Sequence, residues 1–251
     1  MANAPTAQVD ASFMTLIVGM PRSGAGLVTQ TIATLSEGSF AAEMNDLMLA
    51  ARDLQGLTTT GAPIFTKPET LNERTLTEKA SLYLNRIRAA RPNAKIGTDR
   101  LPLNFMNLGL LSAMLPGAKV VYVKRDPMDC ATSCYLHMFQ ANYPFMHDPV
   151  MLGSFMKDAD RIMAHWRKVL PKMPILDVNY DDLLGRPEAT VRKLVEFMGT
   201  PWTDAALVPA REWVSTVTLP DGSMRDLVPD GRVGLGKDYA KHTGAIAKAL
   251  A

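Results

Sequence analysis

Two periodicities of apolar residues divide this chain into predicted strands and helices. Short β-branched runs predict buried strands, and longer stretches with apolar residues three or four positions apart predict amphipathic helices. Strands are predicted at 13–18, 94–98, 118–123 and 175–178. Helices are predicted at 27–35, 42–54, 72–90, 103–114, 129–139, 151–169, 187–198 and 204–214. Because strands alternate with helices, the chain is predicted to form a three-layer α/β sandwich with a central parallel sheet.

The two ends of the chain are less regular than the middle. Residues 1–12 are small and polar, so they are predicted to be a flexible N-terminus before one domain at 13–251. Residues 216–239 show little periodicity. A long irregular segment of this kind is typical either of a mobile region or of a loop that covers a ligand.

Composition and charge narrow the possible functions. The 251 residues are 47% hydrophobic and 21% charged, which are ordinary values for one globular domain. A formal net charge of +2 is too small to indicate a nucleic-acid or membrane-surface partner. The sequence shows neither the pattern of a signal peptide nor an apolar run long enough to span a bilayer, so a cytoplasmic protein without membrane insertion is expected.

Cysteines and histidines do not indicate a metal site or a disulfide framework. The two cysteines, Cys130 and Cys134, lie four apart on one predicted helix, without metal-spaced histidines nearby. We interpret them as packing thiols of a reducing compartment. The four histidines do not have the spacing of a metal site either, so no metal is expected.

The first strand-to-helix junction carries the features of a phosphate-binding loop. The apolar run from Thr15 stops at Gly19, crosses a turn that contains Arg22 and Gly24, and enters a predicted helix. Unpaired N–H groups and the helix dipole make such a junction an anion site. The spacing from Gly19 to Gly24 fits the start of a Walker A loop, but Ala25-Gly26 stand where Lys-Ser/Thr should follow. The loop is therefore a poor match to that of a magnesium-dependent NTPase.

A second junction repeats this arrangement after the strand that ends at Val123. Arg125 offers a planar fork suited to phosphate, and Ser133 lies eight residues later, on nearly the same helical face. Two anion sites at the carboxyl ends of parallel strands suggest one ligand with phosphate groups at both ends. The alternative is that Arg125 pairs with Asp126 or Asp129 and that Ser133 faces solvent.

Together the two motifs resemble the sulfotransferases that use 3′-phosphoadenosine 5′-phosphosulfate (PAPS). Pro21-Arg22-Ser23-Gly24 is similar to the 5′-phosphosulfate loop of that family, and Arg125 with Ser133 eight positions later is similar to its 3′-phosphate motif. Supporting matches lie at 98–105, 165–171 and 180–183. The likeness covers about 15–239 and is to the bacterial branch often fused to tetratricopeptide repeats, which also resembles tyrosylprotein sulfotransferases.

The resemblance implies a fold related to the P-loop nucleotide folds and sulfuryl transfer from PAPS. The product would be adenosine 3′,5′-bisphosphate (PAP), with no metal required, and the acceptor a hydroxyl or amine on a small molecule, saccharide or peptide. Backbone N–H groups of 23–27 would hold the 5′-phosphosulfate, Arg125 and Ser133 the 3′-phosphate, and Tyr180 the adenine. The implied donor-binding residues are Arg22, Ser23, Gly24, Ala25, Gly26, Leu27, Arg125, Ser133, Tyr180, Val233, Gly234 and Lys237.

The tyrosylprotein branch also implies catalytic residues. Glu43 matches a general base, Arg22 and Arg100 match cations that neutralise charge during transfer, and Thr218 roughly matches a hydroxyl donor. Each residue also has a structural interpretation. Glu43 could be a solvated helix residue, Arg100 a surface ion pair, Tyr180 a core residue and Thr218 a plain loop hydroxyl.

One departure from the family keeps an alternative function open. Ala25-Gly26 stand where the family usually has Thr-Thr, which removes two hydroxyl donors worth about 1.5–3 kcal/mol each to a charged group. The alternative is therefore a pseudoenzyme that binds PAP or PAPS but transfers little. A kinase-like NTPase is a third possibility, disfavoured by the missing loop lysine.

Overall fold

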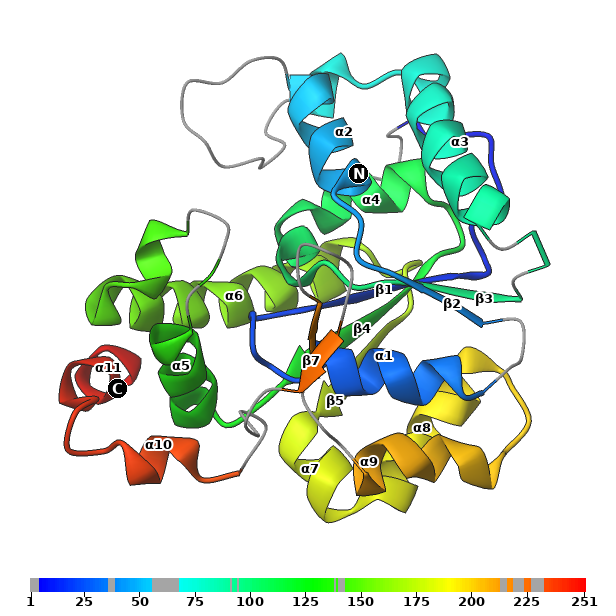
Figure 1. Ribbon diagram of the computed structural model, residues 1–251. Helices are drawn as coiled ribbons and strands as arrows, with labels where there is room; N and C mark the ends of the chain where they lie inside the picture. The colour runs from blue at the N-terminus through cyan, green and yellow to red at the C-terminus, as the bar shows by residue number, and fades with distance from the viewer. Residues whose placement is uncertain are drawn as a thin grey trace.

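The computed structural model describes residues 5–35, 39–55, 68–90, 92–93, 95–137, 139, 143–212, 216–218, 224–226 and 233–251. Within these residues, five parallel strands form a central sheet with helices on both faces (Figure 1). The strands are β1 Met14–Gly19, β2 Ser39–Ala42, β3 Ile96–Asp99, β4 Lys119–Lys124 and β5 Ile175–Asn179. This three-layer arrangement confirms the predicted fold class.

The strand order is β2-β3-β1-β4-β5, with β1 in the middle. The register pairs Gly19 at the end of β1 with Val123 on β4, and Ala42 at the end of β2 with Asp99 on β3. The carboxyl ends of these four strands therefore lie along one edge of the sheet. The chain passes from β3 on one side of β1 to β4 on the other, and ligands of α/β sheets bind beyond the carboxyl ends at such a change of side.

Alternating residues of the central strands face two separate cores. Leu16 of β1 and Val120 of β4 belong to one hydrophobic cluster, and their neighbours Ile17 and Val121 belong to the other. All four side chains are 0% exposed. Burial on both faces is the reason that these strands are continuous apolar runs.

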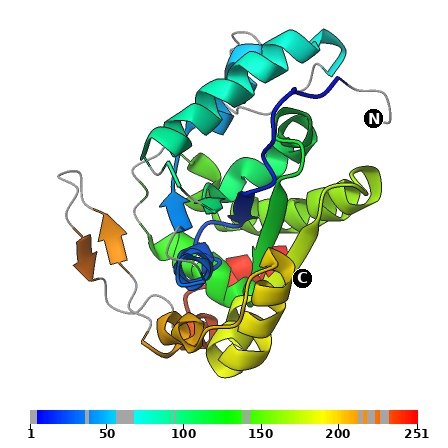
Figure 2. The same cartoon turned by 90° about the vertical axis from the view of Figure 1, so that its right-hand side faces the viewer.

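The helices divide between the two faces in the same way (Figures 1 and 2). The first face is covered by α2 Asp46–Gln55, α3 Glu73–Ala90, α4 Leu108–Met114 and α6 Pro149–Val169. The second is covered by α1 Ala25–Ala33, α8 Pro187–Met198 and α9 Val208–Arg211. The remaining α-helices are α5 Pro127–Leu136, α7 Tyr180–Gly185, α10 Leu235–Asp238 and α11 Gly244–Leu250. Short 3₁₀ turns lie at Pro68–Thr70, Pro102–Asn107, Pro144–Met146 and Asp204–Leu207.

Several elements depart from the sequence prediction. The helix predicted at 42–54 begins at Asp46, and the strand β2 before it was not predicted. The sequence of β2, Ser-Phe-Ala-Ala, has no strand periodicity, and it becomes a strand by pairing with β3. The short helices α7 and α11 were also missed, because six or seven residues are too few for a periodic pattern.

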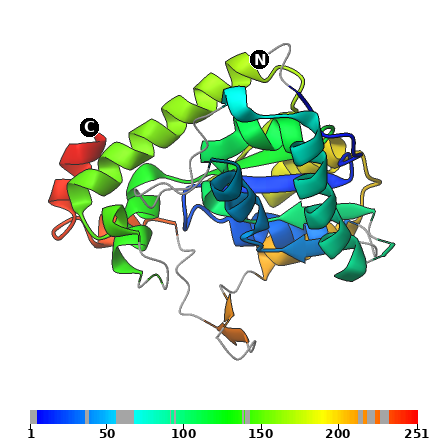
Figure 3. The same ribbon diagram turned by 90° about the horizontal axis from the view of Figure 1, so that it is seen from above.

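Both terminal regions contain described structure. The N–H of Ala7 donates to the carbonyl of Ala113 at 2.8 Å, and Ala7 and Ala11 are buried. The division of the chain at residue 12 stays a prediction. Within the segment predicted to be irregular, β6 Thr216–Thr218 pairs antiparallel with β7 Met224–Asp226. This hairpin stands away from the central sheet (Figures 2 and 3).

Candidate functional site

The loops that follow β1 and β4 meet at the carboxyl edge of the sheet. Arg125 donates from Nη1 to the carbonyl oxygen of Arg22 at 3.0 Å. Arg22 in turn donates from Nε to Oγ of Ser133 at 3.1 Å. The structure therefore brings the three polar side chains of the two predicted motifs into one cluster. Ser133 is only 2% exposed, so the alternative that places it in solvent is wrong.

The loop after β1 has an unusual backbone conformation. Arg22 has φ 66° and Gly24 has φ 100°, both in the left-handed region. The positive φ of Gly24 favours glycine at this position. A Cβ there would also lie 2.0 Å from Cδ2 of Tyr180. The loop is therefore packed tightly onto the Tyr180 ring, which limits its movement.

The turn and the first turn of α1 present donors to the same region. The N–H of Ser23 bonds to the carbonyl of Met20, and the first N–H to bond within the helix is that of Val28, to Gly24. The N–H groups between them are the orphan donors of a helix start. Oγ of Ser23 is buried and has no hydrogen-bond partner among the residues that the structure describes. A buried polar atom at a helix N-terminus fits an anionic ligand.

Two thiols of α5 form hydrogen bonds to the backbone of this loop. Sγ of Cys134 donates to the carbonyl oxygen of Pro21 at 3.0 Å, and Sγ of Cys130 donates to the same oxygen at 3.4 Å. Both cysteines are free and buried, which agrees with the predicted packing thiols. The hydrogen bond with Cys130 and burial raise the pKa of the Cys134 thiol well above its usual range.

Tyr180 lies under the loop rather than on the surface. It is 1% exposed, and the guanidinium carbon of Arg125 lies 5.2 Å from the centre of its ring. Its ring thus supports Gly24 on one side and contacts a cation. The contact with adenine that the resemblance implies stays a prediction.

The two carboxylates near Arg125 bind backbone groups. Oδ1 of Asp126 accepts the N–H of Asp129 at 2.9 Å and so caps α5. The carboxylate of Asp129 accepts the N–H groups of Gly234 and Gly236 at 2.6 and 2.7 Å. Asp129 therefore ties the C-terminal segment to α5, a contact that the sequence analysis missed.

A second polar group lies at the ends of β2 and β3. Because Ala42 pairs with Asp99, the residues that follow them, Glu43 and Arg100, leave the sheet side by side. They form an ion pair whose side chains are 54% and 36% exposed. The structural alternative for Glu43 was a solvated helix residue, and the structural alternative for Arg100 was a surface ion pair. Glu43 lies before α2 rather than in it, at the site edge of the sheet.

Asp99 holds the backbone beside Glu43. It is fully buried, and it accepts hydrogen bonds from the N–H of Met44 at 3.2 Å and from the hydroxyl of Tyr83 at 2.8 Å. Burial raises the pKa of Asp99 to about 6, against the lowering effect of its two donors. The sequence analysis did not name Asp99 as a site residue, although Asp99 lies in the stretch 98–105 that supported the family resemblance.

The remaining predicted residues lie on the C-terminal elements. Gly234 is the N-cap of α10, Lys237 is exposed on that helix, and Val233 is 57% exposed. Thr218 ends β6 on the separate hairpin, and its side chain lies outside the described part of the chain. The structure therefore ties Gly234 to Asp129 of α5, and it does not describe the hydroxyl of Thr218.

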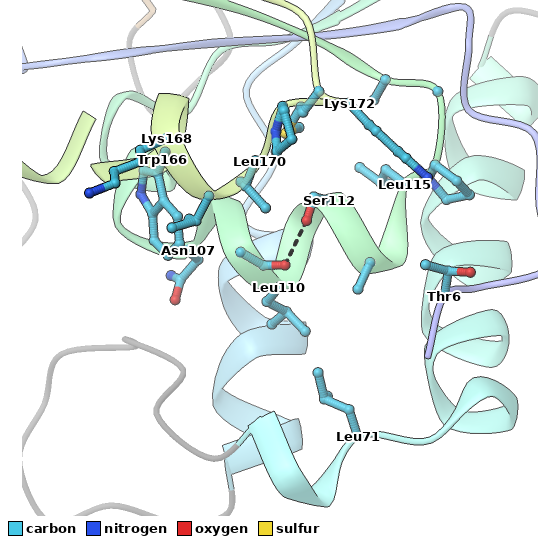
Figure 4. A pocket seen from close by; sticks show the side chains of 18 of the residues that line it. Thr6, Leu71, Asn107, Leu110, Ser112, Leu115, Trp166, Lys168, Leu170 and Lys172 are labelled. Carbon is cyan, nitrogen blue, oxygen red and sulfur yellow. Dashed lines mark hydrogen bonds between the residues drawn. The ribbon is translucent and has the colours of Figure 1, made fainter. Parts of the chain in front are cut away.

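Cavities lie at both ends of β4. A cavity of about 510 Å³ lies at the carboxyl end of β4 and is lined in part by Ser23, Lys124 and Arg125. A larger apolar cavity of about 680 Å³ lies between α4 and the turn after α6, at the amino end of β4 (Figure 4). No predicted site residue lines the larger cavity, whereas Ser23 and Arg125, but not Arg22, Ser133 or Tyr180, line the smaller one. Within the described residues, no group of three histidines, cysteines or carboxylates is placed to hold a metal ion.

The parallel α/β sheet thus carries two cationic strand-to-helix loops side by side at its carboxyl edge. The sequence model of the sulfotransferase family matches residues 15–204, and the chain belongs to this family. An uncharacterised protein of Aquifex aeolicus is 33% identical over 201 residues, which are 76% of this chain and 26% of that protein. The chain thus spans about a quarter of the length of this relative.

Solved structures show the same fold at low identity. The sulfotransferase domain of the Synechococcus PCC 7002 olefin synthase is 18% identical with a TM-score of 0.54, covering 94% of this chain and 95% of that one. Mouse sulfotransferase SULT7A1 complexed with PAP is 17% identical with a TM-score of 0.55, covering 96% and 85%. Among the described residues, none of the helices combines the length and the apolar character needed to cross a membrane.

Proposed function

We propose that this protein transfers a sulfuryl group from PAPS to a hydroxyl or amine acceptor. The observation that carries the proposal is the contact of Arg22 with both Arg125 and Ser133 at the ends of two adjacent strands. Family membership supports sulfuryl transfer, and the PAP bound to mouse SULT7A1 supports the donor. The free N–H groups and the buried Oγ of Ser23 fit the anionic end of such a donor.

Each group of residues would contribute to donor binding in its own way. The N–H groups of 24–27 and Oγ of Ser23 would bind the 5′-phosphosulfate, and Arg125 with Ser133 the 3′-phosphate. Tyr180 would support this end of the site, and Val233, Gly234 and Lys237 would close over the nucleotide. Two of the loop residues, Ala25 and Gly26, act through their backbone alone, because they have no hydroxyl to donate.

The chemistry needs little more than positioning and charge. PAPS supplies an activated sulfuryl group whose leaving group is the 5′-phosphate of PAP. The acceptor oxygen bonds to sulfur while the bond from sulfur to the phosphate oxygen breaks, and Glu43 takes the acceptor proton. Arg22 and Arg100 neutralise the charge that develops, so the side chains supply what a metal would supply in phosphoryl transfer.

Aromatic rings cluster on the segment between α5 and α6 and on α6 itself. Tyr143, Phe145 and Phe155 form a row, with ring centres 6.0 and 4.2 Å apart. Burial, and to a smaller extent the charge of Glu43, raise the pKa of Tyr143. We infer that this row forms one wall of the acceptor cleft, for a small molecule, saccharide or peptide, in a cytoplasmic enzyme.

Two measurements test the proposal. Isothermal titration calorimetry with PAP is expected to show binding to the wild type that Arg125→Gln weakens by one to two orders of magnitude, since a charged hydrogen bond contributes about 1.5–3 kcal/mol. Arg186→Gln is the control, because Arg186 pairs with Asp182 on the surface. Transfer of radiolabelled sulfate from PAPS to a panel of acceptors then separates an enzyme from a protein that only binds the nucleotide. Absence of PAP binding by the wild type would overturn the proposal.

A further inference from the structure

The carboxylate of Asp129 holds the C-terminal segment 233–238 against α5. Oδ2 accepts the N–H of Gly234 at 2.6 Å, and Oδ1 accepts the N–H of Gly236 at 2.7 Å. The residue is 3% exposed, so water does not compete strongly for these bonds. Hydrogen bonds to a charged acceptor are about twice as strong as neutral ones. One side chain thus joins two parts of the chain that are more than 100 residues apart.

The segment approaches α5 as closely as its backbone permits. A Cβ on Gly236 would lie 2.7 Å from Cβ of Met128 and 2.9 Å from the carbonyl carbon of the same residue. Gly234 has φ 90°, a conformation that favours glycine. The two residues that donate to Asp129 are therefore the two whose lack of a side chain permits this contact.

Asp129 lies at the centre of the residues proposed to bind the 3′-phosphate end of the donor. Ser133 lies four residues, about one helical turn, after Asp129 on α5, and Arg125 lies two residues before this helix begins. The segment that it holds carries Gly234 and Lys237, which are proposed to close over the nucleotide. The carboxylate of Asp129 accepts these two hydrogen bonds from backbone N–H groups of that segment.

We propose that Asp129 is a positioning residue for the donor, which fixes segment 233–238 beside Arg125 and Ser133. This inference rests on the proposed function. Because Asp129 acts through the segment rather than on the reacting atoms, its loss changes donor affinity and leaves the transfer step nearly unchanged. A residue that only stabilised the fold would not produce this separation.

The test is Asp129→Asn, which keeps the shape of the side chain but removes its charge and one acceptor. By calorimetry, the dissociation constant of PAP is expected to rise about tenfold to a hundredfold, as for loss of one charged hydrogen bond. The KM for PAPS rises in parallel, and kcat at saturating PAPS stays within about twofold. The matched control is Asp148→Asn, since Asp148 accepts the N–H of Met151 at 2.8 Å at the start of α6. Its PAP affinity is expected to equal that of the wild type.

Hydrogen exchange without nucleotide provides a second readout. Asp129→Asn is expected to speed exchange at Gly234 and Gly236, and Gly236→Ala tests the same contact if the first variant does not fold. Faster exchange with weaker PAP binding supports the inference. Faster exchange with unchanged PAP affinity overturns it and leaves the proposed function intact. A wild type that binds no PAP overturns the proposed function and this inference together.

Discussion

Nε of Arg22 donates a hydrogen bond to Oγ of Ser133 across 3.1 Å, although 111 residues separate them in the chain. Arg22 follows β1 and Ser133 lies on α5, so the bond joins the two strand-to-helix junctions directly. The carbonyl of Arg22 is held by Arg125, and that of Pro21 by two thiols. The guanidinium is thus held in position by the protein itself, which is the condition for electrostatic catalysis without reorganisation.

Replacing Arg22 with lysine keeps the charge but removes the planar fork that reaches Ser133. We expect kcat for sulfuryl transfer to fall about 10²–10³-fold, the usual cost of losing one positioned donor to a developing charge. Initial rates with PAPS and an accepted substrate measure this. Arg161→Lys is the control, because Arg161 is an exposed partner of Asp158 and is expected to leave kcat unchanged. A wild-type kcat in Arg22→Lys would remove Arg22 from the mechanism.

Glu43→Gln removes the carboxylate that is proposed to take the acceptor proton. The transfer rate is expected to fall about 10²–10⁴-fold, the range for loss of a general base. PAP binding by calorimetry should stay within about threefold of the wild type, because Glu43 lies at the ends of β2 and β3 rather than in the donor cluster. Glu78→Gln, which breaks an exposed pair with Arg74, serves as the control. Equal transfer rates in Glu43→Gln and wild type would show that the base is another group.

Gly24→Ala tests the contact between the loop and Tyr180. The new Cβ would lie 2.0 Å from the ring, and alanine is strained at φ 100°. Backbone strain and overpacking together predict a loss of about 2–5 kcal/mol in the free energy of unfolding, measured in urea. Gly199→Ala, at φ 73° with no atom within 4 Å of its Cβ, isolates the backbone effect at about 1–2 kcal/mol. Gly185→Ala has neither problem, and a change within about 0.5 kcal/mol is expected. A Gly24→Ala variant no less stable than Gly199→Ala would contradict the packing argument.

The buried Asp99 makes stability depend on pH. Burial raises its folded pKa from 3.8 to about 6, so between these values the folded state binds more protons than the unfolded state. Stability therefore falls as pH rises from about 4 to about 6 and levels off above that. A difference of about two units between the folded and unfolded pKa of Asp99 corresponds to about 3 kcal/mol in the free energy of unfolding.

The contribution of Asp99 is isolated by comparison with Asp99→Asn, which does not titrate. Unfolding in urea at several pH values is expected to show the wild type losing stability relative to the variant as pH rises through this window. Parallel pH profiles in the two proteins would mean that Asp99 does not titrate there. The neighbours that set this behaviour are Tyr83, the N–H of Met44, Asp46 and Glu43.

Local sequence was sufficient for the long elements and for the two strand-to-helix junctions that carry Arg22 and Arg125. The apolar runs of β1 and β4 extend over a few neighbouring residues, so the local pattern predicts these strands. The strand β2 could not be predicted, because its four residues become a strand only through pairing with β3. The same holds for the C-terminal segment, whose contact depends on Asp129 in a distant helix.

By itself, then, the sequence determined the α/β class, the family resemblance, and the residue types at two strand ends. Only the tertiary structure decided that Arg22 bonds to Ser133, that Tyr180 lies beneath Gly24, and that Asp129 holds Gly234 and Gly236. The physical reason is the range of the interactions. Periodicity and capping act along a few residues of chain, whereas these contacts exist only after the sheet has set the order and register of its strands.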